Sequence, residues 1–109
     1  NKQKSFVEVK NVTLFRNKDT AEFPDAITTR GSKHLITLID AIKKGYKSYL
    51  LFLVQIQNME KFKIAKDIDK EYYNNYIIDK KTGVNFLAYR CDISSKKIFI
   101  EKKLKIIDA

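Results

Sequence analysis

The feature that most constrains the fold is residues 49–56, YLLFLVQI, where apolar side chains fall on both faces of a strand. Such a strand is typical of a sheet covered on both sides. Before it, residues 30–44 carry apolar side chains at helical spacing and end at Gly45. Earlier still, residues 5–15 predict an apolar strand, either single or bent or doubled. Strand, helix and buried strand in this order predict a parallel crossover unit.

The rest of the chain adds a second helix and further strands. The polar residues 17–19 interrupt the first strand, and Phe23-Pro24-Asp25 predicts a loop because proline forces its predecessor to be extended. A second helix is expected from Asp67 or Asp69 to about residue 81, with Gly83 after its end. Residues 84–93 predict a strand, 94–97 a turn and 98–100 a last strand. We therefore expect an α/β fold, a mixed β-sheet flanked by helices.

Length and composition indicate one globular domain. The chain has 109 residues, 44% of them hydrophobic, with 1 proline and 3 glycines, so no linker divides it. The longest apolar run is too short to cross a bilayer, and no signal peptide is recognisable. Cys91 has no second cysteine to pair with and is interpreted as a small buried hydrophobe. We expect a cytoplasmic protein without a membrane partner.

The charge balance points to a polyanionic partner. Lysine and arginine outnumber the acids 22 to 13, which gives a net charge of +9. Nucleic acid is the leading candidate for such a surface. A low-GC genome is an equal alternative, because its codons enrich Lys, Ile, Asn and Tyr, and this chain is rich in all four.

Glu8 and Lys10 are the leading candidates for chemistry. They stand two residues apart on the first strand, so both point to one face while Val7 and Val9 point to the other. A carboxylate can supply oxygen to Mg²⁺, and an ammonium can orient water or neutralise phosphate charge. The same spacing recurs at Glu101 with Lys103, which we place in a charged tail, and at Asp79 with Lys81 in a helix end. The alternative reading of Glu8 and Lys10 is a solvated ion pair of little energetic value.

Five segments together resemble the sugar fermentation stimulation protein family. They are, in order, FVEVKNVTL at 6–14, FPDAITTRG at 23–31, KHL at 33–35, LFLVQ at 51–55 and GV with LAY between 83 and 89. The block FPDA-x-T-x-RG-x-KHL is long and unusual. The resemblance covers residues 6–89, whereas the last 20 residues match only in general character.

The resemblance implies a fold for this chain and further parts of the parent protein outside residues 1–109. It implies a C-terminal domain with a restriction-endonuclease-like PD-(D/E)xK core, in a parent whose N-terminal OB-like domain is absent from residues 1–109. Glu8 and Lys10 would hold the (D/E)xK positions on the central strands, with Glu8 as metal ligand. The first motif acid would lie on a strand before Asn1, since Asp25 follows the Glu-x-Lys pair and stands in a loop.

Other side chains join this candidate site. Gln55 ends the buried strand and would be catalytic as in some relatives, or an ordinary strand-end amide. Arg30, Lys33 and His34 stand at the start of the first helix, where free N–H groups favour phosphate, and are our nucleic-acid-binding candidates. Without the family resemblance, His34 would be interpreted as a partly buried histidine that serves packing.

The remaining polar candidates have structural alternatives. Asp25 and Thr28 are candidate orienting residues or helix caps, and Thr29 is a second possible cap. The tyrosines of the second helix are interpreted as core rather than as stacking surfaces for bases.

Two functions follow, with DNA as the partner and no strong sequence preference. The first is a DNA-binding domain, with the role in regulating sugar catabolism that the family name implies. The alternative is a Mg²⁺-dependent DNA phosphodiesterase that uses Glu8 and Lys10. A small RNA- or ribosome-associated protein would explain the charge but not the FPDA block. The sequence leaves open whether DNA is cleaved and which oligomer forms.

Overall fold

A computed structural model describes residues 4–92 and 99–107 of the chain. Its two helices are α1 (Thr29–Lys43) and α2 (Lys70–Thr82). Its strands are β1 (Ser5–Val12), β2 (Leu14–Phe15), β3 (Thr20–Phe23), β4 (Lys47–Val54), β5 (Lys61–Ile64), β6 (Asn85–Asp92) and β7 (Phe99–Ile107). Neither helix in these residues is long and apolar enough to span a membrane.

The strands form one mixed sheet in the order β1-β4-β6-β7-β5-β3-β2. Strands β1, β4 and β6 run parallel, β5 runs parallel to β3 and β7, and β7 is antiparallel to β6. The α/β class and the parallel pairing of the first strand with the buried one are therefore confirmed. Within the described residues β1 is the first strand in this order and pairs with β4.

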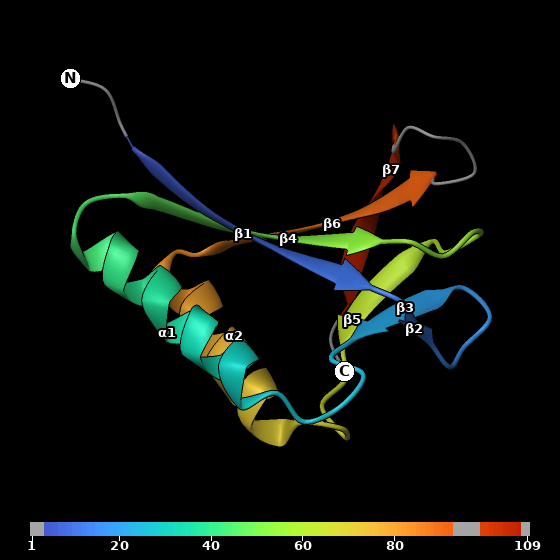
Figure 1. Ribbon diagram of the computed structural model, residues 1–109, viewed down its shortest axis with the longest axis horizontal. Coiled ribbons are helices and arrows are strands. Elements are labelled where there is room, and N and C mark those ends of the chain that lie inside the picture. Colours follow the sequence, from blue (N-terminus) through green and yellow to red (C-terminus); the bar gives the residue numbers. More distant parts are fainter. Residues whose placement is uncertain (1–3, 93–98, 108–109) are drawn as a thin grey trace.

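The sheet curls so that strands far apart in its order pack against each other. Phe52 on β4 stacks on Phe62 of β5 with ring centroids 4.4 Å apart, and Phe23 on β3 lies 5.5 Å from Phe52. Two strands separate β4 from β5 in the sheet, so these contacts require curvature. Figure 1 shows β2, β3 and β5 turned against the β1–β4–β6 layer, with α1 and α2 side by side. The core lies inside this curl and under the helices.

Both helices begin and end at recognisable caps. Thr28 caps α1 through its side chain, and Asp69 caps α2. Gly83 ends α2 in the left-handed conformation, φ 119°, as its position in the sequence predicts. On α2, Tyr72 and Tyr76 are buried, which confirms the interpretation of these two tyrosines as core.

Several expectations need correction. Strands β3 and β5 were not predicted, and β7 is a long strand that includes Glu101 and Lys103, which the sequence placed in a charged tail. Strand β4 is fully buried on one face only, because Leu51 and Leu53 on its other face are half-buried. The turn predicted over 94–97 lies outside the described residues. Cys91 is buried on β6, as expected, and burial raises the pKa of its thiol.

Candidate functional site

Glu8 and Lys10 lie side by side on the inner face of β1. In the parallel register with β4, Glu8 is opposite Leu50 and Lys10 opposite Phe52, two residues with no exposed surface. Val7 and Val9 point the other way and are about half exposed. The Lys10 ammonium nitrogen lies 3.7 Å from a carboxylate oxygen of Glu8. The predicted pairing of the two side chains on one face is present.

His34 of α1 completes a three-residue cluster with them. Its Nδ1 atom is 2.6 Å from the Lys10 nitrogen and 3.3 Å from Glu8 Oε1. An ammonium can only donate, so Nδ1 is the acceptor in its contact with Lys10. The side chains of Lys10, His34 and Glu8 are 15%, 26% and 27% exposed, so the cluster remains open to a ligand.

The start of α1 is held beside this cluster by the second helix. Thr28 Oγ1 accepts a hydrogen bond from the Gly31 N–H at 2.9 Å, and the Thr28 N–H donates to Asp69 at 2.8 Å. The other oxygen of Asp69 accepts from the Tyr72 N–H, so one buried carboxylate ties both helix starts together. Thr28 is thus a helix cap, one of the two roles predicted for it.

Arg30 and Lys33 are exposed on the first turns of α1. Arg30 stands one turn before His34 on the same side of the helix. Arg30 therefore lies on the side of α1 that carries His34, whereas Lys33, adjacent to His34 in the sequence, points in another direction around the helix.

Gln55 and Asp25 are not brought into the cluster. The Gln55 side chain donates to Asn11 Oδ1 at 2.9 Å. Asn11 follows Lys10 by one residue and so lies on the opposite face of β1. Asp25 is exposed in the loop before α1. The structure thus assembles Glu8, Lys10 and His34, and it leaves Arg30 and Lys33 exposed on the first turns of α1, but it does not bring Gln55 to the cluster.

Sequence reasoning missed Tyr72 as a polar group near this cluster. Its ring is fully buried, and its hydroxyl has no hydrogen-bond partner among the described residues. Burial, together with the negative charges of Asp79, Asp69 and Glu8, raises the pKa of Tyr72. The helical spacing of the tyrosines indicates a core position, and no sequence signal shows where the hydroxyl points.

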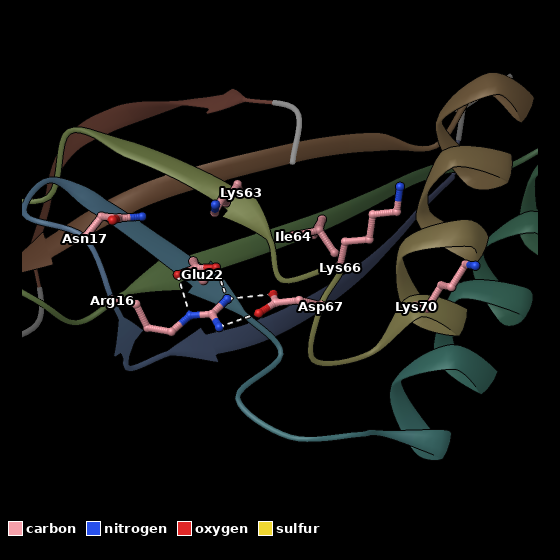
Figure 2. A pocket seen from close by; sticks show the side chains of 8 residues that line it. All are labelled: Arg16, Asn17, Glu22, Lys63, Ile64, Lys66, Asp67 and Lys70. Carbon is pink, nitrogen blue, oxygen red and sulfur yellow. Dashed lines mark hydrogen bonds and ion pairs between the residues drawn. The ribbon is translucent and has the colours of Figure 1, made fainter.

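A second charged cluster was also missed, on the outside of β2, β3 and β5. Glu22 of β3 is 1% exposed, and Arg16 covers it with two hydrogen bonds of 2.6 and 2.9 Å. Arg16 also binds Asp67, as Figure 2 shows. A buried carboxylate needs such a partner, since an unpaired buried charge is strongly destabilising. The sequence signal for this charged cluster is a glutamate between the apolar residues Ala21 and Phe23 of the short strand 20–23.

The metal-binding capacity of the cluster is limited. Mg²⁺ takes hard oxygen ligands, and Glu8 is the carboxylate that the Glu8–Lys10–His34 cluster supplies. Within residues 4–92 and 99–107, no group of three or more His, Cys, Asp and Glu side chains could hold an ion. Glu8 can therefore furnish one metal ligand, and a complete site requires others.

Known proteins resemble the chain in both sequence and fold. Residues 1–97 match the family described as the sugar fermentation stimulation protein RE domain. A sugar fermentation stimulation protein homolog of Pelagibacter ubique is 76% identical over 109 residues, which are 100% of this chain and 47% of that one. The homolog of Syntrophotalea carbinolica is 44% identical over 97% of this chain and 46% of its own.

A solved structure has the same fold. The Pyrococcus furiosus protein described as SfsA in complex with Ca²⁺ superimposes with a TM-score of 0.85 at 27% identity. The match covers 94% of this chain and 45% of that one. The chain thus spans about half the length of the relatives it matches. The nuclease-like core expected from the sequence is consistent with this fold, and the chain belongs to the sugar fermentation stimulation protein family.

Proposed function

We propose that this domain binds DNA through its phosphates at the cluster formed by Glu8, Lys10 and His34. The observation that carries the proposal is the position of the Lys10 ammonium, held between a carboxylate and an imidazole at the start of α1. Arg30 and Lys33 add two exposed cations on the first turns of the helix. The net charge of +9 supplies the long-range attraction for a polyanion.

This mode of binding predicts little sequence preference. Phosphate contacts fix the position of a protein on the duplex but do not read bases. A role in regulating sugar catabolism, which the family description suggests, would then require another part of the protein or a partner to select the site. It remains part of the proposal and rests on that description.

A second candidate is a metal-dependent phosphodiesterase. Two observations favour it: the Glu8–Lys10 pair, and the Ca²⁺ described for the Pyrococcus furiosus relative. A divalent ion would polarise the phosphate and bound water. Glu8 would be one of its ligands, and Lys10 would bind or orient the phosphate beside it. The described residues do not by themselves complete the site of such an ion.

Binding is tested with the full-length protein and a 20-base-pair duplex at one fixed salt concentration. We expect Lys10→Ala to weaken binding about tenfold, since it removes a charge-assisted phosphate contact. Lys81→Ala, at the far end of α2, makes the same charge change and serves as the matched control. Equal affinities for the two variants, with circular dichroism confirming that both are folded, would contradict the proposed site.

Cleavage is tested separately with plasmid DNA in Mg²⁺ or Mn²⁺. Nicking by the native protein that is lost in both Glu8→Gln and Lys10→Ala would establish the phosphodiesterase. Binding at this cluster without nicking in either metal would establish the DNA-binding domain. The binding and cleavage results together therefore separate the two functions.

A further inference from the structure

A hollow of about 760 Å³ opens on the outer side of β3 and β5, next to the start of α2. Figure 2 shows the side chains that line it, which come from the β2–β3 turn, from β3 and β5, from the segment that leads into α2, and from the first residue of α2. Four of them are cationic, Arg16, Lys63, Lys66 and Lys70, and two are acidic, Glu22 and Asp67. The hollow is thus cationic on balance.

The guanidinium of Arg16 is held at the floor of this hollow by two carboxylates. Its Nε and Nη2 atoms donate to Glu22, and its Nη1 and Nη2 atoms donate to Asp67 at 2.6 and 2.8 Å. Both contacts use the planar fork that Arg presents equally well to carboxylate and to phosphate.

The two carboxylates differ in how firmly they are fixed. The Glu22 side chain is 1% exposed and lies on a strand, whereas the Asp67 side chain is 67% exposed and lies in the segment between β5 and α2. Glu22 therefore orients the guanidinium permanently. Asp67 occupies its outer fork from the solvent side, where a dissolved anion can compete with it.

Three lysines also line the hollow, and Figure 2 shows the Lys66 and Lys70 side chains extending away from Arg16 and Asp67. Lys63 is opposite Glu22 in the β3–β5 register and so shares its face, Lys66 lies over the Tyr73 ring at 5.0 Å, and Lys70 is the first residue of α2. Within the described part of the chain, none of the three forms an ion pair. A doubly charged oxyanion in the hollow would meet more positive charge than the single carboxylate of Asp67 balances.

We propose that this hollow is a phosphate-binding site in which Arg16, oriented by Glu22, binds a phosphate group through the fork that Asp67 occupies in the free protein. Lys63 and Lys70 supply the surrounding charge. The phosphate comes from a small phosphomonoester or from a nucleic-acid backbone. The site is separate in its residues from the Glu8–Lys10–His34 cluster, so it does not rest on the proposed function.

The test replaces Asp67, whose carboxylate competes with phosphate for Arg16, by alanine. Binding of inorganic phosphate to the full-length protein is measured by calorimetry for Asp67→Ala and for Asp40→Ala, an exposed aspartate of α1 that makes the same charge change. We expect Asp67→Ala to bind phosphate about tenfold more tightly than Asp40→Ala, because two charge-assisted hydrogen bonds of Arg16 become available. Equal affinities in the two variants would overturn the proposal.

Two further measurements show whether Arg16 is the phosphate ligand and which kind of molecule supplies the phosphate. Arg16→Lys in the Asp67→Ala background keeps the charge but removes the fork, and it should abolish the gain. If the gain persists, Arg16 is not the ligand and the proposal fails. A matching gain for a 20-base-pair duplex assigns the site to the nucleic-acid backbone, and a gain restricted to inorganic phosphate and glycerol 1-phosphate assigns it to a small molecule. Both measurements leave Lys10 intact, so they succeed or fail independently of the first site.

Discussion

At the scale of single residues, Gly31 shows how closely the two helix starts approach each other. A Cβ atom built on Gly31 would lie 2.7 Å from Thr28 Cγ2 and 3.0 Å from Tyr72 Cε1. Neither neighbour can retreat easily, because Thr28 is tied to Asp69 and the Tyr72 ring is fully buried. The glycine of the FPDA-x-T-x-RG-x-KHL block is therefore required for packing between α1 and α2.

Gly31→Ala is expected to destabilise the protein although it improves helix propensity. Propensity alone favours alanine inside a helix by about 1 kcal/mol. The clash opposes it by roughly 1–3 kcal/mol, the usual cost of overpacking. We expect the free energy of unfolding in urea to fall by about 1 kcal/mol. Thr37→Ala, at an exposed position of the same helix, is the control and should change it little. A more stable Gly31→Ala would show that Thr28 and Tyr72 move aside freely.

Single residues also show what the sequence alone can predict of the site. Alternation along a strand is enough to place Glu8 beside Lys10, since it depends on neighbouring residues only. The contact of Lys10 with His34 joins residues 24 positions apart and depends on how α1 docks on β1. The family block, not the spacing, pointed to His34. Alternation also places Asn11 on the face of β1 opposite Glu8 and Lys10. Gln55, which donates to Asn11, therefore lies on that opposite face too.

At the scale of elements, long patterned segments were predicted and short ones were missed. The helices α1 and α2 have clear caps and apolar spacing, and their predicted bounds agree with the structure to within about three residues. Strands β3 and β5 have four residues each, too few for alternation to be distinguished from a loop. They are stabilised by pairing with each other and, for β5, with β7, and such long-range pairing leaves no local signal.

Helix α2 carries a buried carboxyl group that makes stability depend on pH. Asp79 is 1% exposed, one of its oxygens has no hydrogen-bond partner within residues 4–92 and 99–107, and burial raises its pKa to about 7. The unfolded chain releases this proton near pH 4, so between about pH 4 and 7 the folded state binds more protons than the unfolded state. Asp79 therefore lowers stability progressively as pH rises through that window. Asp67 acts in the opposite direction, because Arg16 lowers its pKa to about 2 and its contribution is lost only in acid.

Asp79→Asn is expected to remove the loss of stability that Asp79 causes as the pH rises. The variant and the native protein should be about equally stable at pH 4, and the variant should gain roughly 3–4 kcal/mol by pH 7.5, because the pKa of Asp79 is raised by about three units and each unit corresponds to roughly 1.4 kcal/mol. Urea unfolding at a series of pH values measures the difference curve, in which the other carboxylates cancel. Asp40→Asn on the exposed side of α1 is the control for the same change of charge. A difference curve for Asp79→Asn that does not vary with pH would mean that Asp79 stays ionised in the folded state.

At the scale of the whole molecule, the net charge of +9 has two explanations that a single affinity cannot separate. Charge that reflects composition alone attracts any polyanion, and each lysine then contributes about equally. Charge that is placed at a binding site makes some lysines contribute far more to the affinity than others. Counterion release distinguishes the two, because the slope of log affinity against log salt is about −0.9 for each phosphate that the protein neutralises on duplex DNA.

We therefore expect Lys10→Ala to reduce the magnitude of that slope by about 0.9, the value for one lost phosphate contact. Lys81→Ala, which lowers the net charge equally, should leave the slope unchanged within error. The measurement is fluorescence anisotropy of a 20-base-pair duplex with the full-length protein between 50 and 200 mM KCl, the range over which such slopes are well defined. Equal small changes in both variants would favour the compositional origin of the charge. A change confined to Lys10 would mean that the phosphate lies against the strand where Glu8 and His34 hold that ammonium in place.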